Sequence, residues 1–146
     1  MTNAQTGHPE YFDGHKLDRK GKMLQASCAL PLMFPAIQIH GVPYYDGGIA
    51  DPIPVRKSIR EGNEKNLIVL TRPKEYRKEL SRSTKATAKI LGRKYPRLPE
   101  LLLNRHLRYN ETVKFCERQE KAGKAVILRP DHPIESLEKD IDILQQ

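Results

Sequence analysis

The first half of the chain alternates short apolar segments with residues that favour turns. Residues 36–40 alternate apolar and polar side chains, a spacing typical of a half-buried strand. Gly41-Val42-Pro43 predicts a turn into a second strand ending at Tyr44-Tyr45, which completes a hairpin. The continuous apolar run Leu67–Thr71 is typical of a strand buried on both faces of a parallel sheet. Short helices are expected at residues 21–28 and 55–61.

Beyond Pro73 the apolar positions follow helical spacing. The pattern predicts one helix over residues 76–94 and a second over residues 100–121, with Gly123 as a cap. A second strand is expected at residues 125–128. The apolar side chains that would share helical faces are Leu102, His106, Tyr109, Val113 and Cys116 in the second helix, and Leu137, Ile141 and Leu144 in a last one. The sequence therefore predicts an α/β fold followed by a mainly helical C-terminal region.

Positive charge is concentrated in one segment. The chain has 26 Lys and Arg against 18 Asp and Glu, a formal net charge of +8, and residues 72–125 alone carry a net +10. This shift predicts a domain boundary near Pro73, between residues 1–72 and residues 73–146. Such a charge suits an anionic lipid surface or nucleic acid. Surface Lys and Arg usually need no partner, however, and we favour a solvated helix face.

Several classes of protein and site are not indicated. No apolar stretch approaches the roughly 20 residues of a membrane-spanning helix, and the first ten residues do not resemble a signal peptide. These features indicate the cytoplasm, and Cys28 and Cys116 are expected to be buried free thiols. We expect no metal and no cofactor, since Gly-rich phosphate loops are missing and no metal-ligand spacing occurs among His8, His15, His40, His106 and His132.

Asp46 is the candidate for chemistry. It follows two tyrosines and precedes Gly47 and Gly48, which would allow positive φ and a close approach of the backbone to a partner. Asp-Gly is also among the commonest turn dipeptides, so the motif taken on its own favours a simple turn. No serine lies in G-x-S-x-G, the elbow that serine hydrolases use to present the nucleophile.

Three motifs in order resemble the bacterial branch of the patatin-like phospholipase family. Ala26-Ser27-Cys28-Ala29-Leu30-Pro31 with Phe34-Pro35 is similar to the family's A-S-x-A-x-P-x-x-F-P. Tyr45-Asp46-Gly47-Gly48 is similar to its D-G-G/A motif, and Asp51-Pro52-Ile53-Pro54 to the segment that follows. The basic residues downstream of Arg72 resemble the helical C-terminal extension of such bacterial proteins.

The resemblance implies a lipid acyl hydrolase with a Ser–Asp dyad on a three-layer α/β core. By motif position Asp46 would be the general base, with Gly47 and Gly48 as the site's loop glycines. The family's oxyanion loop and G-x-S-x-G serine lie upstream of the matched motifs, so we expect this chain to be the C-terminal portion of such a protein. It would be inactive alone, with exposed edges and an unfilled core.

Two functions from different classes follow. The first is a fragment of a cytoplasmic serine esterase that acts on a lipid ester, completed by the N-terminal half of its catalytic domain and peripheral at an anionic membrane. The second is a non-enzymatic module that uses Arg72–Lys124 to bind an anionic membrane, a protein or nucleic acid. No specific nucleic acid is expected, because the basic segment has few aromatic side chains to stack on bases.

Overall fold

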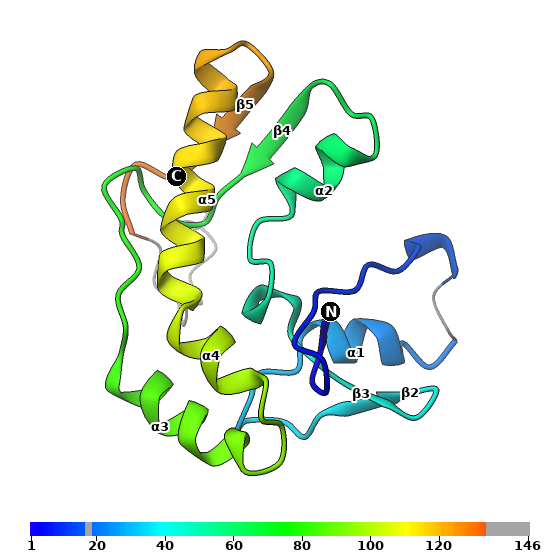
Figure 1. Ribbon diagram of the computed structural model, residues 1–146. Helices are drawn as coiled ribbons and strands as arrows, with labels where there is room; N and C mark the ends of the chain where they lie inside the picture. The colour runs from blue at the N-terminus through cyan, green and yellow to red at the C-terminus, as the bar shows by residue number, and fades with distance from the viewer. Residues whose placement is uncertain (17–18, 134–146) are drawn as a thin grey trace. The chain divides into compact units, whose positions relative to one another are not determined.

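The chain forms two compact units, each built from two separate segments. The computed structural model describes residues 1–16 and 19–133. The first unit combines Met1–Ile53 with Lys78–Glu111, and the second combines Pro54–Arg77 with the chain from Thr112 on (Figure 1). The helix predicted around Leu137, Ile141 and Leu144 lies outside the described residues. The division into residues 1–72 and 73–146 stays a prediction.

A three-stranded antiparallel sheet lies in the first unit. Its order is β1 (Thr2–Asn3), β3 (Val42–Tyr45) and β2 (Ile37–Ile39). The predicted hairpin is confirmed, but its turn is His40-Gly41, with φ of 49° and 79°. Two successive residues with positive φ form the tight connection that matches the twist of paired strands. Val42 and Pro43, which the sequence pattern places in the turn, already belong to β3.

Short helices flank this sheet. The predicted first helix is α1 (Lys22–Ser27), which contacts β2 and β3 and buries Ala26 against the hairpin residues Ile39 and Tyr44. Two single-turn 3₁₀ helices complete the segment, η1 (Gly14–Lys16) and η2 (Gly47–Ile49). The two-residue strand β1 was not predicted, because it is too short to show any alternation of apolar and polar positions.

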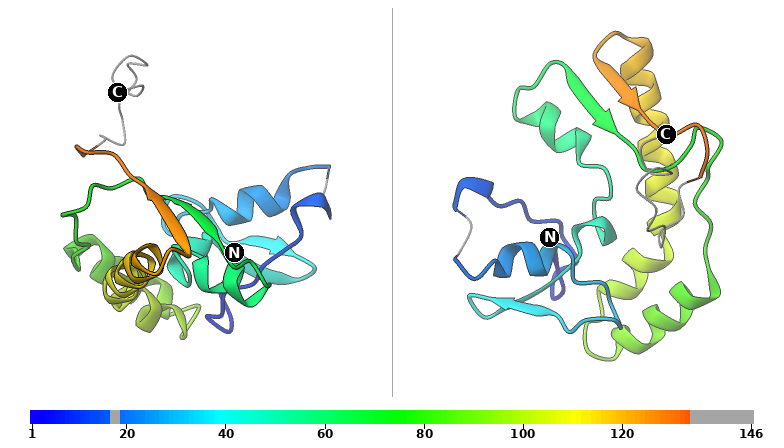
Figure 2. Two further views of the ribbon diagram at one scale, coloured as in Figure 1. Left: turned by 90° about the horizontal axis from the view of Figure 1, so that it is seen from above. Right: turned by 180° about the vertical axis from the view of Figure 1, so that it is seen from behind.

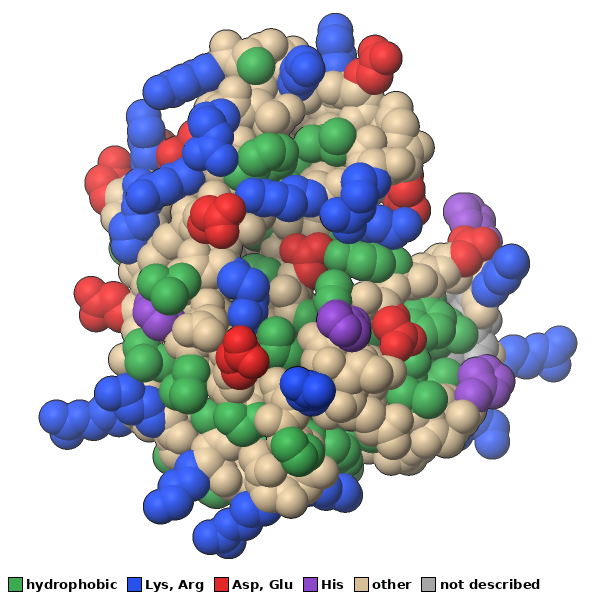
Figure 3. Space-filling view, viewed as in Figure 1, with side chains coloured by type: hydrophobic (Ala, Val, Ile, Leu, Met, Phe, Trp, Pro, Cys, Tyr) green, Lys and Arg blue, Asp and Glu red, His purple; other side chains and the backbone are tan. Residues whose placement is uncertain are grey.

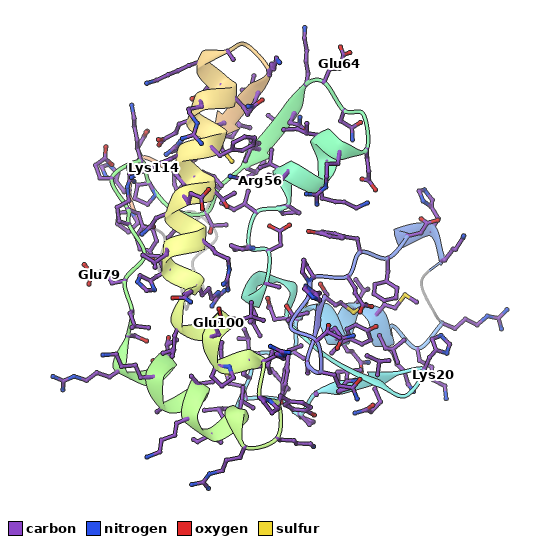
Figure 4. The ribbon with its side chains drawn as sticks, viewed as in Figure 1. Lys20, Arg56, Glu64, Glu79, Glu100 and Lys114 are labelled. Atoms are coloured by element: carbon purple, nitrogen blue, oxygen red, sulfur yellow. The ribbon has the colours of Figure 1, made fainter. Side chains whose placement is uncertain are left out.

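The helical segment differs from the prediction at both of its helix starts. The helix expected at residues 76–94 is α3 (Arg82–Gly92), which Ser81 caps by accepting a hydrogen bond from the Thr84 N–H at 3.1 Å. The residues before it are not helical, because the Asn110 amide bonds both the N–H and the carbonyl of Lys78, at 2.8 and 3.0 Å. Glu79 points away from the chain there (Figure 4).

The helix expected at residues 100–121 is divided into α4 (Leu98–Leu103) and α5 (Arg105–Lys121). The carbonyl of Leu101 would bond the Arg105 N–H in a continuous helix. It accepts a hydrogen bond from the Arg108 guanidinium at 2.5 Å. Satisfying this carbonyl with a side chain lets the helix break at Asn104 without leaving a polar group unpaired.

One apolar core joins the two segments of the first unit. Tyr45 packs edge-on against Tyr95, with ring centroids 6.0 Å apart. Gly92 and Pro99 bring α3 and α4 together, and a Cβ at Gly92 would lie 2.7 Å from the proline ring. The buried cluster consists of Ala4, Ala29, Tyr45, Ile49, Ala88, Leu91, Tyr95, Leu98 and Leu102. The sheet and η2 thus share one core with α3 and α4, which come much later in the sequence.

The second unit contains both predicted apolar strands, and they pair with each other. Strands β4 (Asn66–Val69) and β5 (Ala125–Leu128) pair in parallel, and helix α2 (Val55–Arg60) contacts β4 (green and orange arrows in Figure 2). The Arg56 side chain lies over the Phe115 ring of α5 at 4.1 Å (Figure 4). Gly123 ends α5 with φ of 69°, as predicted for a cap.

Burial on both faces of Leu67–Thr71 was a wrong expectation for this chain. Ile68 and Leu70 are buried, whereas Leu67 and Val69 are 67% and 69% exposed. Val126 and Leu128 on β5 are also more than half exposed. This strand pair therefore presents exposed apolar side chains.

The predicted α/β class with its helical C-terminal region is confirmed by these strands and helices. Of the two thiols, Cys116 is buried as predicted, and burial raises its pKa. Cys28 is exposed, which corrects the expectation, because it is the C-cap of α1 and lies past the part of the helix that packs on the hairpin through Met23 and Ala26. None of the described helices is both long and apolar enough to cross a membrane.

Candidate functional site

Asp46 lies where β3 ends and η2 begins. Its backbone leaves the extended region (φ −44°, ψ 132°), and its Oδ1 accepts a hydrogen bond from the Gly48 N–H at 2.6 Å. This bond uses one of the two carboxylate oxygens. The side chain is half-buried, so it keeps access to solvent. The interpretation of Asp-Gly-Gly as a turn is therefore correct for the backbone, and the same turn holds the carboxylate in one orientation.

The backbone of Asp46 is bonded on both sides. Its N–H donates to the carbonyl of Ala29 at 3.0 Å, which links it to the A-S-x-A-x-P motif. Its carbonyl accepts from the Thr2 hydroxyl at 2.7 Å, and the same hydroxyl accepts from the Ala50 N–H at 3.2 Å. Three segments of the chain thus converge on this one residue. Thr2 was not predicted, because no motif includes it.

The two glycines serve close packing, and the expected positive φ is not found. Neither Gly47 nor Gly48 is among the glycines with positive φ. A Cβ on Gly48 would lie 2.9 Å from Asp46 Oδ1 and 3.2 Å from Arg105 Nη2. A Cβ on Gly47 would lie 3.3 Å from the Met1 nitrogen. A side chain at Gly48 would displace the carboxylate itself, so glycine is required here by space.

Two arginines from α5 hold the carbonyls of η2. Arg105 Nε donates to the carbonyl of Gly48 at 2.7 Å, and Arg108 Nη2 donates to the carbonyl of Ile49 at 2.9 Å. The pKa of Arg108 is lowered, mainly by burial and then by the positive charge of Arg105. Both residues were expected on a solvated basic face, and that expectation is wrong for these two positions.

A second polar cluster lies two residues before Asp46. The Tyr44 hydroxyl donates to Glu10 Oε2 at 2.5 Å, and the Asn3 amide donates to Glu10 Oε1 at 2.7 Å. These bonds lower the pKa of Glu10, and burial followed by the Glu10 contact raises the pKa of Tyr44 to about 12. Nearby, the Tyr11 hydroxyl donates to the Asp51 carboxylate. Both clusters anchor the first residues against β3 and η2.

Two further observations concern the described residues away from Asp46. No group of three or more His, Cys, Asp or Glu side chains there could hold a metal ion. A cavity of about 610 Å³ lies in the second unit and contains none of the candidate site residues. It is lined by Ile59, Gly62, Asn63, Glu64, Lys65, Gln119, Gly123 and Lys124.

Comparison with known families assigns the two ends of the chain differently. Residues 4–58 match the family model described as patatin-like phospholipase, and this segment contains Asp46, Gly47 and Gly48. Residues 95–146 match a model described as a domain of unknown function, DUF6363, and this segment contains Arg105 and Arg108. No curated protein and no solved structure matches the chain. The patatin-like resemblance is confirmed for the first segment, whereas the bacterial branch stays a prediction.

Proposed function

We propose that this chain is the aspartate-bearing portion of a patatin-like lipid acyl hydrolase. In this proposal Asp46 is the general base for a serine contributed by residues outside these 146. The observation that carries the proposal is the position of Asp46, which directly follows β3 and caps η2 inside the segment that matches the patatin-like phospholipase model. A carboxylate fixed at a strand end by its own turn is a suitable proton acceptor.

The proposed reaction needs only one proton acceptor from this chain. The serine hydroxyl gives its proton to the Asp46 carboxylate while its oxygen bonds to the ester carbonyl carbon. Collapse of the tetrahedral intermediate breaks the ester C–O bond, and the leaving alcohol takes the proton from Asp46. Water then attacks the acyl-serine with the same proton transfer and releases the fatty acid. Donors to the oxyanion, like the serine, would come from outside this chain.

The test requires a protein in which an upstream segment carrying G-x-S-x-G is joined to this chain. Asp46→Asn is expected to lower kcat for ester hydrolysis by about 10²- to 10⁴-fold, because the substituted amide cannot accept the proton. Asp51→Asn is the matched control, since this carboxylate bonds Tyr11 and not the η2 turn. Equal losses in the two variants would assign Asp46 to the turn alone and favour the non-enzymatic interaction module.

We also propose that the partner is an anionic lipid surface, and the structure supports a different contact segment from the one predicted. Leu30, Leu32, Met33 and Phe34 form an apolar loop, defined here as residues 30–34, in which Met33 is 71% exposed. Phe34 N–H donates to the Leu30 carbonyl at 3.0 Å, so the loop has a defined turn. Residue 29, directly before the loop, bonds Asp46, which connects the apolar loop to the proposed site.

The charged residues that immediately precede the apolar loop in the sequence are basic. Residues 19–45 contain Arg19, Lys20 and Lys22 but no Asp or Glu. All three basic side chains are exposed, and Lys20 points outward in Figure 4. Exposed apolar side chains flanked by cations are the combination that binds the surface of an anionic bilayer. Lys and Arg side chains also project from much of the face seen in Figure 3.

A further inference from the structure

Two guanidinium groups one helical turn apart bind two successive carbonyls of the η2 turn. Arg105 and Arg108 lie at positions i and i+3 of α5, so both side chains project from the same side of the helix. They reach Gly48 and Ile49, which are 57 and 59 residues away in sequence. All four residues belong to the first unit. The contacts therefore fix a long-range connection rather than a local turn.

These bonds act on the same short turn that orients the candidate base. Asp46 Oδ1 accepts from the Gly48 N–H, while Arg105 Nε donates to the Gly48 carbonyl, so Gly48 is bonded at both of its backbone groups. Hydrogen bonds from a charged donor are shorter and stronger than those between neutral groups. Loss of Arg105 would remove the charged donor from the Gly48 carbonyl, next to the N–H that bonds the Asp46 carboxylate.

The arginine arrangement carries an electrostatic cost. Two positive side chains lie next to each other, and Arg108 is half-buried with its Nε buried and without a hydrogen-bond partner. Burial and the Arg105 charge both lower the pKa of Arg108. A surface position would avoid this cost, as the exposed Arg93 of the same unit does. The pair is therefore better explained by a requirement of the η2 turn than by chance placement.

We propose that Arg105 and Arg108 are positioning residues that fix the Asp46–Ile49 turn. The segment matched by the domain of unknown function would thereby set the geometry of the base in the segment matched by the patatin-like phospholipase model. This inference rests on the proposed function of Asp46. In this inference, the segment matched by DUF6363 contributes two arginines that hold the Asp46–Ile49 turn.

The first test uses the full chain and needs no activity. Amide exchange with water, measured by NMR, is expected to rise about tenfold or more at Gly48 in Arg105→Ala, because its turn loses a charge-assisted bond. The Leu70 amide, which donates to Leu128 at 2.8 Å in the second unit, is the internal reference and should not change. Arg93→Ala is the control arginine and should leave Gly48 unaffected. Arg105→Gln, which keeps an N–H donor, should recover part of the protection.

Equal loss of protection at Gly48 and Leu70 would overturn the inference, because the arginine would then stabilise the fold in general. Unchanged exchange at Gly48 in Arg105→Ala would overturn it as well. Should Arg105→Ala fail to fold, Arg105→Met is the second variant, because it keeps an aliphatic side chain but has no donor for the Gly48 carbonyl. Unchanged exchange at Gly48 in Arg105→Met would also overturn the inference.

The second test uses the protein completed by its serine-bearing segment. Arg105→Ala is expected to lower kcat at least tenfold with little change in KM, and Arg105→Lys is expected to restore part of the rate. If Asp46→Asn hydrolyses ester as the unmodified protein does, the proposed function is wrong. If Asp46→Asn is inactive while Arg105→Ala and Arg108→Ala keep the full kcat, the proposed function stands and the positioning role is wrong.

Discussion

The hydrogen bond between Tyr44 and Glu10 holds the chain's first residues against the strand that delivers Asp46. Tyr44 is buried, and burial together with the Glu10 contact raises its pKa to about 12. A raised pKa means that the folded state holds the proton more tightly than the unfolded state, whose value is near 10. The contribution of Tyr44 to stability is therefore complete below about pH 10 and is lost as the pH rises toward about 12.

Tyr44→Phe is the corresponding prediction. The variant should lose the tyrosinate absorbance that titrates near pH 12 and should be less stable at neutral pH by about 1 kcal/mol. Its stability should also fall less steeply than that of the unmodified chain between about pH 10 and about pH 12. Spectrophotometric titration and urea unfolding at several alkaline pH values measure these effects. Identical alkaline profiles for the two proteins would show that the Tyr44–Glu10 bond does not contribute as described.

At the residue scale the sequence could indicate Asp46 as the candidate base, but not the residues that bond its turn. Asp46 is visible because a carboxylate before two glycines is a local pattern. Arg105 and Arg108 bind backbone carbonyls 57 and 59 residues away, and a carbonyl has the same chemistry in every residue, so no sequence pattern marks it. The reason expected for the two glycines was wrong, because neither has a positive φ. A Cβ at Gly48 would instead come too close to the Asp46 carboxylate.

At the element scale the contact between α3 and α4 depends on the missing side chain of Gly92. A Cβ there would lie 2.7 Å from Cγ of Pro99, whose ring cannot move away as a flexible chain could. Gly92→Ala would gain up to about 1 kcal/mol from helix propensity, but overpacking costs about 1–3 kcal/mol. We therefore expect a net loss of about 1 kcal/mol or more in the free energy of unfolding.

Urea denaturation of Gly92→Ala measures this loss, and Gly14→Ala is its control. A Cβ added at Gly14 would meet no neighbouring atom within 4 Å, and its φ is not positive, so an alanine should be tolerated there. A Gly92→Ala protein as stable as Gly14→Ala would mean that α3 and α4 separate easily. The shared core containing Leu91 and Leu98 would then contribute less to the first unit than its burial indicates.

Element ends were harder to predict than element types. The hairpin, α1, α2 and both parallel strands follow from local periodicity and turn residues, and they are confirmed. The start of α3 depends on the Asn110 amide, which bonds Lys78 from 32 residues away. The break between α4 and α5 coincides with a bond from the Arg108 side chain. Tertiary contacts therefore decide these two boundaries, and a periodic pattern cannot show them.

At the scale of the whole molecule, the proposed function assigns one catalytic group, Asp46, to these residues. The 146 residues contain no G-x-S-x-G serine, and a general base alone supplies a small part of the rate enhancement of serine esterases. We predict that the purified chain hydrolyses a short-chain nitrophenyl ester no faster than buffer. Turnover that disappears in Asp46→Asn would contradict this prediction, because it would require a nucleophile within the chain itself.

Exposed apolar side chains occur both in the apolar loop, residues 30–34, and on β4, and the two places differ in the charges around them. Leu67 and Val69 on β4 belong to a paired strand, and the chain around them carries both Glu64 and Lys65. Met33 and Phe34 belong to a loop within a stretch that has only positive charges. If lipid attachment needs both apolar contact and cations, only the loop meets the requirement.

Co-sedimentation with vesicles containing phosphatidylserine tests this distinction. The double variant Met33→Ser, Phe34→Ser should weaken attachment about tenfold or more, because it removes two apolar side chains that would be buried in the bilayer. Leu67→Ser with Val69→Ser is the matched control, with comparable exposure, and should bind as the unmodified chain does. Attachment should also weaken as salt rises, because the field of an anionic surface decays over about 10 Å at 0.1 M. Equal binding to neutral vesicles, or equal loss in both double variants, would show that the loop is not a lipid contact and would return the basic segment Arg72–Lys124 to consideration.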